Sequence, residues 1–284
     1  MAELLKGAPV AAALDKQTKS AVEALLLEGV IPTLAILRVG ERDDDVAYER
    51  GAMKRCAKLG IRVKNVLLPS GVNQAALMAG IEKLNADQSV HGVLMLRPLP
   101  KTLDEKAACA ALDPAKDVDG VTAASMAGIY SGSGEGFPPC TAQSCMELLR
   151  YYGVITTGKR AAVIGRSLVI GKPAAMLLTA ADATVTVCHT KTADTPSVAR
   201  QADILLVAAG RAESIGTECF RAGQTVIDVG INWSETKQKL VGDVNYDAAL
   251  PVVAAITPVP AGVGAVTTAV LAAHVVRAAE RAAL

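Results

Sequence analysis

The chain has 284 residues, enough for two ordinary domains, and 51% of them are hydrophobic, enough to bury a substantial core. The formal net charge is +1, and the absence of a basic stripe argues against nucleic acid as a partner. No apolar run reaches the length of a membrane span and the N-terminal segment is too charged for a signal peptide, so we expect no membrane partner and a cytoplasmic location. No metal site is expected, since the six cysteines form no cluster with histidine at zinc-ligand spacing.

Apolar runs rich in Val, Ile and Leu alternate with stretches of helical period. The predicted strands are Thr33–Val39, Ile61–Leu67, Val93–Leu96, Ala161–Ile164, Ala183–Cys188, Ile204–Ala208, Thr225–Val229 and Val253–Ile256. The predicted helices are Asp15–Leu27, Ala47–Leu59, Gln74–Leu84, Ala142–Tyr151, Gly171–Ala180 and Val263–Ala283. Buried parallel strands are continuous apolar runs, so the pattern predicts an α/β protein with open, mostly parallel sheets and helices on both faces.

The elements form two blocks. The first ends near Asp119–Gly120, and the glycine- and proline-rich segment Tyr130–Pro139 reads as the loop that follows. The second block opens with the helix after Thr141 and runs to about Gly262. The final helix, from Val263, has no following strand, so the pattern alone allows it to pack on either block.

A glycine-containing turn joins the strand Ala161–Ile164 to the next helix. Backbone N–H groups and a helix N-terminus in this setting can hold a pyrophosphate. The usual G-x-G-x-x-G spacing is altered, because Ser167 stands where the second glycine would be. A tight turn without a ligand is therefore the alternative interpretation.

The end of the following strand bears on the choice of nucleotide. An NAD-selective site usually has a carboxylate there for the ribose 2′-hydroxyl, but this chain has His189-Thr190-Lys191-Thr192. Together with Arg166, these groups suit a 2′-phosphate, which favours NADP over NAD. Lys191 as a solvated surface charge is the alternative.

Motifs along nearly the whole chain resemble the methylenetetrahydrofolate dehydrogenase/cyclohydrolase family. The matching segments include PTLAILRVG (32–40), PLPKTLDEK (98–106), PAKDVDG (114–120), VIGRSLVIGKPAAMLL (163–178), VIDVGIN (226–232) and TPVPAGVGAVT (257–267). In the last segment, Ala261 and Ala265 replace a glycine and a proline of the family pattern.

The resemblance implies a fold of two α/β domains and a homodimer formed through the cofactor domain. The folate-binding catalytic domain is expected at residues 1–140, with the C-terminal helix 263–284 packed back on it, and a Rossmann-like NAD(P) domain at 141–262. The implied reaction is oxidation of 5,10-methylenetetrahydrofolate to 5,10-methenyltetrahydrofolate with NADP, a step in one-carbon metabolism. The folate is expected in a cleft between the two domains.

The resemblance also assigns residues to the two ligands. Tyr48 would lie against the folate rings, and Asp119 would accept hydrogen bonds from the amino-pyrimidine edge; both would be catalytic-site residues. From the sequence alone, Tyr48 could instead be a core residue and Asp119 a helix cap. The other implied folate contacts are Leu96, Pro260, Gly262, Val263 and Gly264. The implied cofactor contacts are Gly165, Arg166, Ser167, Thr190 and Ile231.

Two residues depart from the cyclohydrolase pattern. The family places a lysine four residues after the tyrosine, on the same helix face, but this chain has Ala52. Lys54 is about 200° further around the helix and should face elsewhere. Leu96 replaces the glutamine that supports the lysine. Asp45 stands where the family commonly has serine.

These departures lead to the hypothesis of a dehydrogenase without cyclohydrolase activity, because hydride transfer needs positioning but hydrolysis needs acid–base groups. One alternative is a bifunctional enzyme that uses Asp45, Lys54 or Arg97 as the base; of these, Asp45 is the best candidate, since arginine stays protonated. A folate-binding protein without turnover and a dehydrogenase for another substrate are the remaining alternatives.

Overall fold

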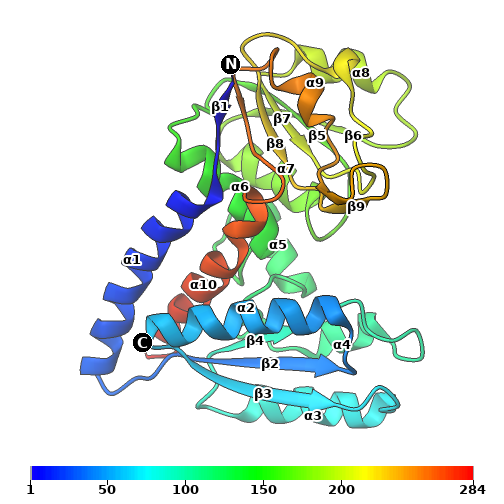
Figure 1. Ribbon diagram of the computed structural model, residues 1–284. Helices are drawn as coiled ribbons and strands as arrows, with labels where there is room; N and C mark the ends of the chain where they lie inside the picture. The colour runs from blue at the N-terminus through cyan, green and yellow to red at the C-terminus, as the bar shows by residue number, and fades with distance from the viewer. Residues whose placement is uncertain (1, 284) are drawn as a thin grey trace. The chain divides into compact units, whose positions relative to one another are not determined.

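The computed structural model, which describes residues 2–283, divides into two compact units (Figure 1). The six-stranded unit comprises the described residues up to Ala12 together with Thr141–Thr267. The three-stranded unit comprises Ala13–Cys140 and the described residues from Thr268 on. No helix among the described residues is long and apolar enough to cross a membrane.

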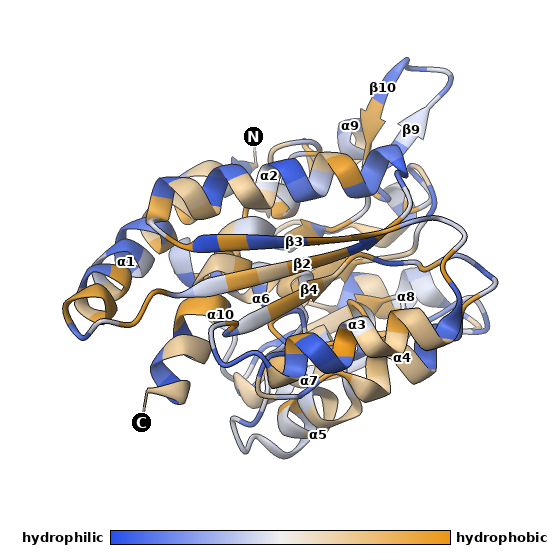
Figure 2. Cartoon of the chain, turned by 90° about the horizontal axis from the view of Figure 1, so that it is seen from below, coloured by the Kyte–Doolittle hydropathy of each residue, from blue (hydrophilic) through white to orange (hydrophobic). Residues whose placement is uncertain are grey.

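The three-stranded sheet is parallel throughout, with the order β3-β2-β4. The central strand β2 (Thr33–Val39) is completely buried, and so is the short β4 (Gly92–Met95). The edge strand β3 (Arg62–Leu68) alternates between exposed and half-buried residues and carries hydrophilic side chains at its start (Figure 2). Strands β2 and β4 therefore have the continuous burial that the sequence predicts for a covered parallel sheet, whereas β3 does not.

Helices cover both faces of this sheet. Helix α2 (Asp43–Leu59) lies on one face, whereas α3 (Gln74–Ala86) and α4 (Glu105–Ala111) lie on the other (Figures 1 and 2). The C-terminal helix α10 (Thr267–Ala282) places Val275 against Gly92 of β4, where a Cβ on the glycine would meet its side chain at 3.1 Å. The predicted packing of the last helix on the N-terminal domain is thus confirmed. The remaining helices are α1 (Gly7–Leu27), which spans the boundary between the units, and α5 (Ala123–Ser131).

The six-stranded sheet is also parallel, with the order β1-β11-β8-β7-β5-β6. Its strands are β1 (Glu3–Leu4), β5 (Arg160–Ile164), β6 (Thr184–Cys188), β7 (Ile204–Val207), β8 (Thr225–Asp228) and β11 (Ala255–Ile256). The first strand of this block, β5, has β6 on one side and β7 on the other, so the strand order reverses at β5. In open α/β sheets, ligands bind beyond the carboxyl ends of the strands at such a reversal.

Short helices and a hairpin complete the unit. They are α6 (Cys140–Tyr151), α7 (Gly171–Ala180), α8 (Thr195–Gln201), α9 (Tyr246–Ala249), the 3-10 turns η1 (Thr217–Cys219) and η2 (Val263–Ala265), and the antiparallel pair β9 (Asn232–Ser234) and β10 (Lys239–Val241).

The boundaries of the units differ from the predicted domains at two places. The parallel pairing of β1 with β11 assigns the N-terminal residues to the six-stranded unit, instead of to the domain predicted at 1–140. The second boundary lies after Thr267 rather than after Gly262. The loop before α10 is attached to the six-stranded unit, since the Gly7 amide donates to Ala261 O at 2.8 Å.

Candidate functional site

The carboxyl end of the three-stranded sheet brings together the first turn of α2 and the segment after β4. Arg42, just before α2, donates from one guanidinium nitrogen to Asp45 Oδ1 at 2.6 Å and to the Arg97 carbonyl at 3.0 Å. Asp45 is buried and ion-paired. Its carboxylate is therefore already engaged by a cation.

One face of helix α2 is buried in the three-stranded unit. Asp45, Glu49, Ala52, Cys56 and Leu59 are buried, at the spacing of a single helix face. Tyr48 is half-buried, whereas Lys54 is exposed, as its position around the helix predicts. Ala52 is only 1% exposed, so a methyl group inside the unit occupies this position of the helix face.

Glu49 is a buried carboxylate on this face that sequence analysis did not single out. Its Oε2 accepts from Arg38 Nε at 2.6 Å, and its Oε1 accepts from Asn65 Nδ2 at 2.7 Å. Arg38 is on β2 and Asn65 on β3, so the network joins α2 to two strands. Both carboxylate oxygens of Glu49 therefore accept hydrogen bonds from side chains of the sheet, which gives Glu49 a structural role.

The segment after β4 is apolar at its first position. Leu96 is 7% exposed, and its amide donates to Leu37 O of β2 at 2.9 Å. Arg97 pairs with Glu105 at 3.4 Å, and the other oxygen of Glu105 accepts from the Leu99 amide at 2.8 Å. Leu96 thus offers no group that could support a base.

The two aspartates of the motif DVDG (117–120) have different surroundings. Asp117 is fully buried and accepts from the amides of Val121 (2.9 Å) and Thr122 (2.8 Å) and from the Ser125 hydroxyl (2.7 Å), before and within the first turn of α5. Asp119 is only partly buried, and its Oδ1 receives a long hydrogen bond of 3.4 Å from the Cys140 amide. Asp117 therefore has the structural role considered for Asp119.

The carboxyl of Asp119 is partly shielded from solvent and lies near the guanidinium of Arg97. Burial raises the pKa of its carboxyl, while hydrogen bonding to Cys140 and the positive charge of Arg97 act in the opposite direction. The neighbouring Cys140 thiol lies 3.8 Å from His274 Nδ1, and burial raises the pKa of that thiol well above its usual value. The thiol is therefore not an activated nucleophile.

The loop after β11 contains the other predicted folate contacts. Pro260 and Gly262 flank Ala261, which adopts a φ of 80°, a backbone conformation that favours glycine. Val263 is buried in η2, and a Cβ on Gly264 would lie 3.3 Å from Cδ1 of Ile231. Ile231 follows β8 and is 59% exposed. The loop and Ile231 are thus neighbours.

A cavity of about 440 Å³ lies beyond the carboxyl ends of β5, β6 and β7. Its walls include four of the five predicted cofactor residues, Gly165, Arg166, Ser167 and Thr190. The fifth, Ile231, does not line it, and neither does Lys191, which is exposed. Arg211 and Ser214, from the segment after β7, also line it and were not predicted.

The glycine turn leaves no space for side chains at two positions. A Cβ on Gly165, whose φ is +121°, would lie 2.2 Å from Ala208 O, and one on Gly171 would lie 2.2 Å from Gly165 O. Ser167 Oγ accepts from the Ile170 amide at 3.1 Å, so this hydroxyl shapes the turn. The residue before α7, Ile170, provides no side-chain cap. The first amides of α7 are engaged within the turn, since Gly171 N donates to Ser167 Oγ at 3.5 Å and Lys172 N donates to Ser167 O at 3.0 Å.

The polar groups of this cavity fit a phosphorylated nucleotide. Arg166 and Arg211 contribute two guanidinium groups, and neither has an ion-pair partner among the described residues. At the end of β6, His189 and Thr190 stand where an NAD-selective site has a carboxylate. The donor set therefore suits a 2′-phosphate better than a bare 2′-hydroxyl.

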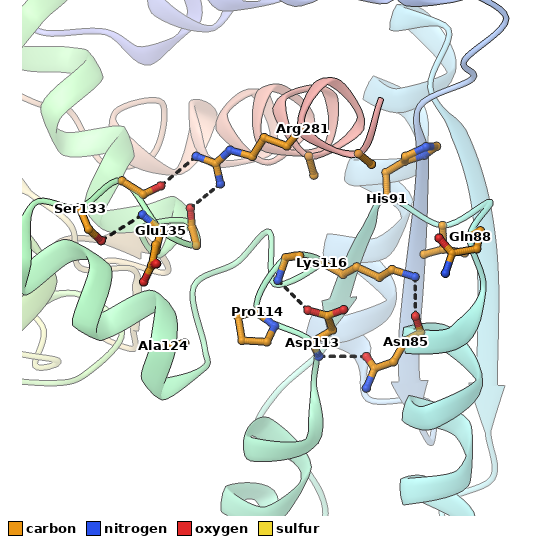
Figure 3. A pocket seen from close by; sticks show the side chains of 16 residues that line it. Asn85, Gln88, His91, Asp113, Pro114, Lys116, Ala124, Ser133, Glu135 and Arg281 are labelled. Carbon is orange, nitrogen blue, oxygen red and sulfur yellow. Dashed lines mark hydrogen bonds between the residues drawn. The ribbon is translucent and has the colours of Figure 1, made fainter. Parts of the chain in front are cut away.

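A second cavity, of about 760 Å³, lies in the three-stranded unit and contains none of the predicted site residues (Figure 3). Its two main cations hold backbone segments together. Lys116 Nζ donates to the carbonyls of Leu84, Asn85 and Asp87 at 2.8–3.0 Å, at the end of α3. Arg281 donates to Gly134 O and Gly136 O at 3.0 and 3.1 Å. These contacts give the cavity wall a structural function.

Comparisons with known proteins agree with this geometry. The catalytic-domain model of the tetrahydrofolate dehydrogenase/cyclohydrolase family matches residues 5–119, and the NAD(P)-binding-domain model of the same family matches residues 139–283. A bifunctional protein FolD from Carboxydothermus hydrogenoformans is 46% identical over 281 residues, covering 99% of this chain and 98% of the relative. The FolD protein of Clostridioides difficile is 44% identical over 276 residues, covering 97% and 96%.

Solved structures give the same result. The bifunctional FolD of Campylobacter jejuni superimposes with a TM-score of 0.96 at 36% identity, covering 99% of both chains. The FolD of Trypanosoma brucei, solved with NADP and an inhibitor, has a TM-score of 0.92 at 36% identity, covering 99% of this chain and 98% of that one. With both family models matched in order and relatives above 40% identity over the full length, this chain belongs to the tetrahydrofolate dehydrogenase/cyclohydrolase family.

Proposed function

We propose that this protein oxidises 5,10-methylenetetrahydrofolate to 5,10-methenyltetrahydrofolate with NADP, and that it does not hydrolyse the product. Family membership supports the hydride transfer. The single observation that carries the second part is the pair Ala52 and Leu96, two buried apolar side chains at the positions of the family lysine and glutamine.

The hydride step makes few demands on protein side chains. NADP supplies the hydride acceptor, and the electrons that expel the hydride come from the folate nitrogens. The protein has to hold the two reactants in contact and exclude competing reactions. In this proposal, Asp119 accepts from the amino-pyrimidine edge, and Tyr48 lies against the folate rings. The partial exposure of Asp119 supports its role, because an ionised carboxylate can accept two N–H bonds together. The roles of Leu96, Pro260, Gly262, Val263 and Gly264 as folate contacts stay predictions.

Hydrolysis of the methenyl product makes a different demand. Water must be activated and protons moved, and such acid–base assistance is typically worth about 10²–10⁴-fold in rate. Three alternative bases come from the sequence, and a fourth, Glu49, comes from the structure. Asp45 pairs with Arg42, Arg97 pairs with Glu105, Lys54 is exposed on another face of α2, and Glu49 is held by Arg38 and Asn65. These contacts support loss of the hydrolytic step.

The test supplies purified protein with methylenetetrahydrofolate and NADP and measures NADPH and methenyltetrahydrofolate together. We expect equal amounts of both, with 10-formyltetrahydrofolate forming no faster than in a protein-free control that starts from methenyltetrahydrofolate. A bifunctional relative serves as the positive control for hydrolysis. Protein-dependent formation of the formyl compound would contradict the proposal, and a lower rate in Asp45→Asn would then identify Asp45 as the base. Absence of any NADPH would favour a folate-binding protein without turnover.

The cofactor preference needs its own comparison. Arg166, Arg211, His189 and Thr190 around the cavity support NADP over NAD. We expect titrations at equal salt to give tighter binding of NADP, and equal affinity for both nucleotides would contradict this preference.

A homodimer formed through the six-stranded unit is part of the proposal. Among residues 2–283, no strand pairs with the outer edge of β6, and apolar side chains of this unit are exposed, including Val187 (38%), Tyr151 (48%) and Ile155 (68%). Unpaired edges and apolar surface are common features of subunit contacts. The mass in solution by light scattering tests it, and a monomer at all concentrations would contradict it.

A further inference from the structure

The cavity beyond β5, β6 and β7 has a wall that the pyrophosphate and the ribose do not explain. In a doubly wound fold, the glycine turn holds the pyrophosphate and the end of the second strand holds the adenosine ribose. Here these are Gly165–Ser167 and His189–Thr190. The opposite wall is formed by the start of α8, with Pro196, and by the segment after β7, with Ser214 and Ile215. The base attached to that ribose is the remaining group of suitable size and polarity for this wall.

Ser214 is unusual within this wall. Its hydroxyl oxygen is buried and is the one buried side-chain nitrogen or oxygen, among the described residues, that has no hydrogen-bond partner. Leaving a hydroxyl buried and unpaired is energetically unfavourable, so native proteins generally provide a partner. A ligand that forms a hydrogen bond with this hydroxyl would remove the energetic penalty.

The backbone on both sides of Ser214 is fixed. The Glu213 amide donates to Gly242 O at 2.9 Å, and the Ile215 amide donates to Asp243 O at 3.0 Å. The Asn245 amide donates back to Ile215 O at 2.9 Å, completing a parallel bridge between Ile215 and Val244. These hydrogen bonds hold the backbone on both sides of Ser214 in place, and rotation about the Cα–Cβ bond sets the direction of its hydroxyl.

We propose that the Ser214 hydroxyl hydrogen-bonds the adenine ring of the bound nucleotide and thereby positions the adenosine half. The assignment rests on the proposed NADP-binding function of this cavity. A hydroxyl can donate to a ring nitrogen of adenine or accept from its 6-amino group, so either edge of the base provides the missing partner. Pro196 and Ile215 supply the apolar surroundings that a planar base requires.

The test compares wild type, Ser214→Ala and a matched control, Ser234→Ala. Ser234 is a buried serine of the same unit, but its hydroxyl already pairs with Thr236 and lies outside the cavity. Calorimetric titration with 2′,5′-ADP, the phosphorylated adenosine half of NADP, measures binding without catalysis. Loss of one neutral hydrogen bond predicts binding about three- to tenfold weaker in Ser214→Ala and unchanged in Ser234→Ala.

Thermal unfolding without ligand separates a ligand contact from a structural role. Removing an unpaired buried hydroxyl should leave the melting temperature of Ser214→Ala equal to that of wild type or higher. Wild-type affinity in Ser214→Ala would overturn the proposal, and so would weaker binding together with a lower melting temperature. If wild type itself fails to bind 2′,5′-ADP, the proposed cofactor site is wrong, which is a separate outcome from failure of Ser214 alone.

Discussion

At the residue scale, the motif DVDG shows what a sequence leaves open. Both of its aspartates carry the same chemistry, and either could cap the helix that follows. The structure directs Asp117 to the amides before α5 and the Ser125 hydroxyl, whereas Asp119 contacts the amide and the side chain of Cys140. The arrangement of donors around each carboxylate depends on tertiary packing, which residue spacing does not encode.

Replacing Asp119 tests its proposed folate role. An asparagine side chain has one acceptor oxygen and cannot accept two N–H bonds in the geometry of a carboxylate. Because a hydrogen bond to a charged group contributes about 1.5–3 kcal/mol, Asp119→Asn should raise the KM for methylenetetrahydrofolate by about 10–100-fold. The affinity for NADP should not change. Asp104→Asn, at the N-cap of α4, is the control, and a KM for Asp119→Asn equal to that of the control would contradict the role.

The buried pair Ala52 and Leu96 leads to a second test. A lysine alone at position 52 would lack its supporting amide and would enter a packed region, where added volume typically costs about 1–3 kcal/mol. We therefore expect Ala52→Lys to be less stable in urea unfolding and to show no methenyl hydrolysis above background. Hydrolysis by this single variant would show that Leu96 is not limiting. The double variant Ala52→Lys with Leu96→Gln is the comparison.

Elements were predictable where a pattern repeats over many residues. The apolar runs of β2 and β5 and the longer helices were predicted to within a few residues, except that α1 begins at Gly7 instead of Asp15. Its first turn contains Pro9, which is tolerated there because the amide lacks a helical partner. The two-residue strand β1 and the four-residue helix α9 were missed, since such short segments show no periodicity, whereas β11 lies within the predicted strand Val253–Ile256. Helix α5 extends to Ser131, into the predicted loop Tyr130–Pro139.

The loop between β11 and α10 contains local strain that substitution can release. Ala261 has a φ of 80°, where a non-glycine residue costs about 1–2 kcal/mol. Glycine removes that cost but adds freedom to the unfolded chain, which offsets about 0.5–1 kcal/mol. Ala261→Gly should therefore unfold at a higher urea concentration, with a gain of about 0.5–1 kcal/mol. Ala265→Gly, in η2 without a positive φ, should instead be destabilised, and the same sign for both variants would contradict this explanation.

Helix α10 is joined to the segment after β4 through His274. A carbonyl only accepts, so the Nδ1–H of His274 donates to Val118 O at 2.9 Å, and burial lowers the pKa of this imidazole to about 4. The unfolded chain takes up a proton near pH 6.5, whereas the folded protein resists it. The stability from neutral His274 is therefore present above pH 6.5 and is lost as the pH falls toward 4, by about 3 kcal/mol in all.

Urea unfolding across this pH range checks the effect. His274→Gln should be less stable than wild type at pH 7, because it loses ring packing against Phe137. Its free energy of unfolding should fall less steeply between pH 6.5 and 4. Parallel curves for the two proteins would contradict the assignment.

At the scale of the whole molecule, the division into units depends on contacts that are remote in sequence. The pairing of β1 with β11 joins residues about 250 positions apart. No local signal marks Glu3–Leu4 as a strand of the second block, so the predicted boundary missed it. The network of Glu49, Arg38 and Asn65 was invisible for the same reason. The family motifs nevertheless indicated both sheets, because several of them contain or follow a buried strand, as at β2, β4 and β5.

A dehydrogenase without the hydrolytic step has a kinetic signature of its own. Hydride transfer is reversible, so methenyltetrahydrofolate and NADPH should accumulate until the reaction stops at equilibrium. Adding a separate cyclohydrolase removes the product and should restart NADPH formation in a mixture that has come to rest. With a bifunctional relative in place of this protein, the addition should have little effect, since hydrolysis already follows oxidation. The opposite result would be a mixture that contains 10-formyltetrahydrofolate and forms no more NADPH when the cyclohydrolase is added. That result would show that the chain catalyses both reactions despite Ala52 and Leu96.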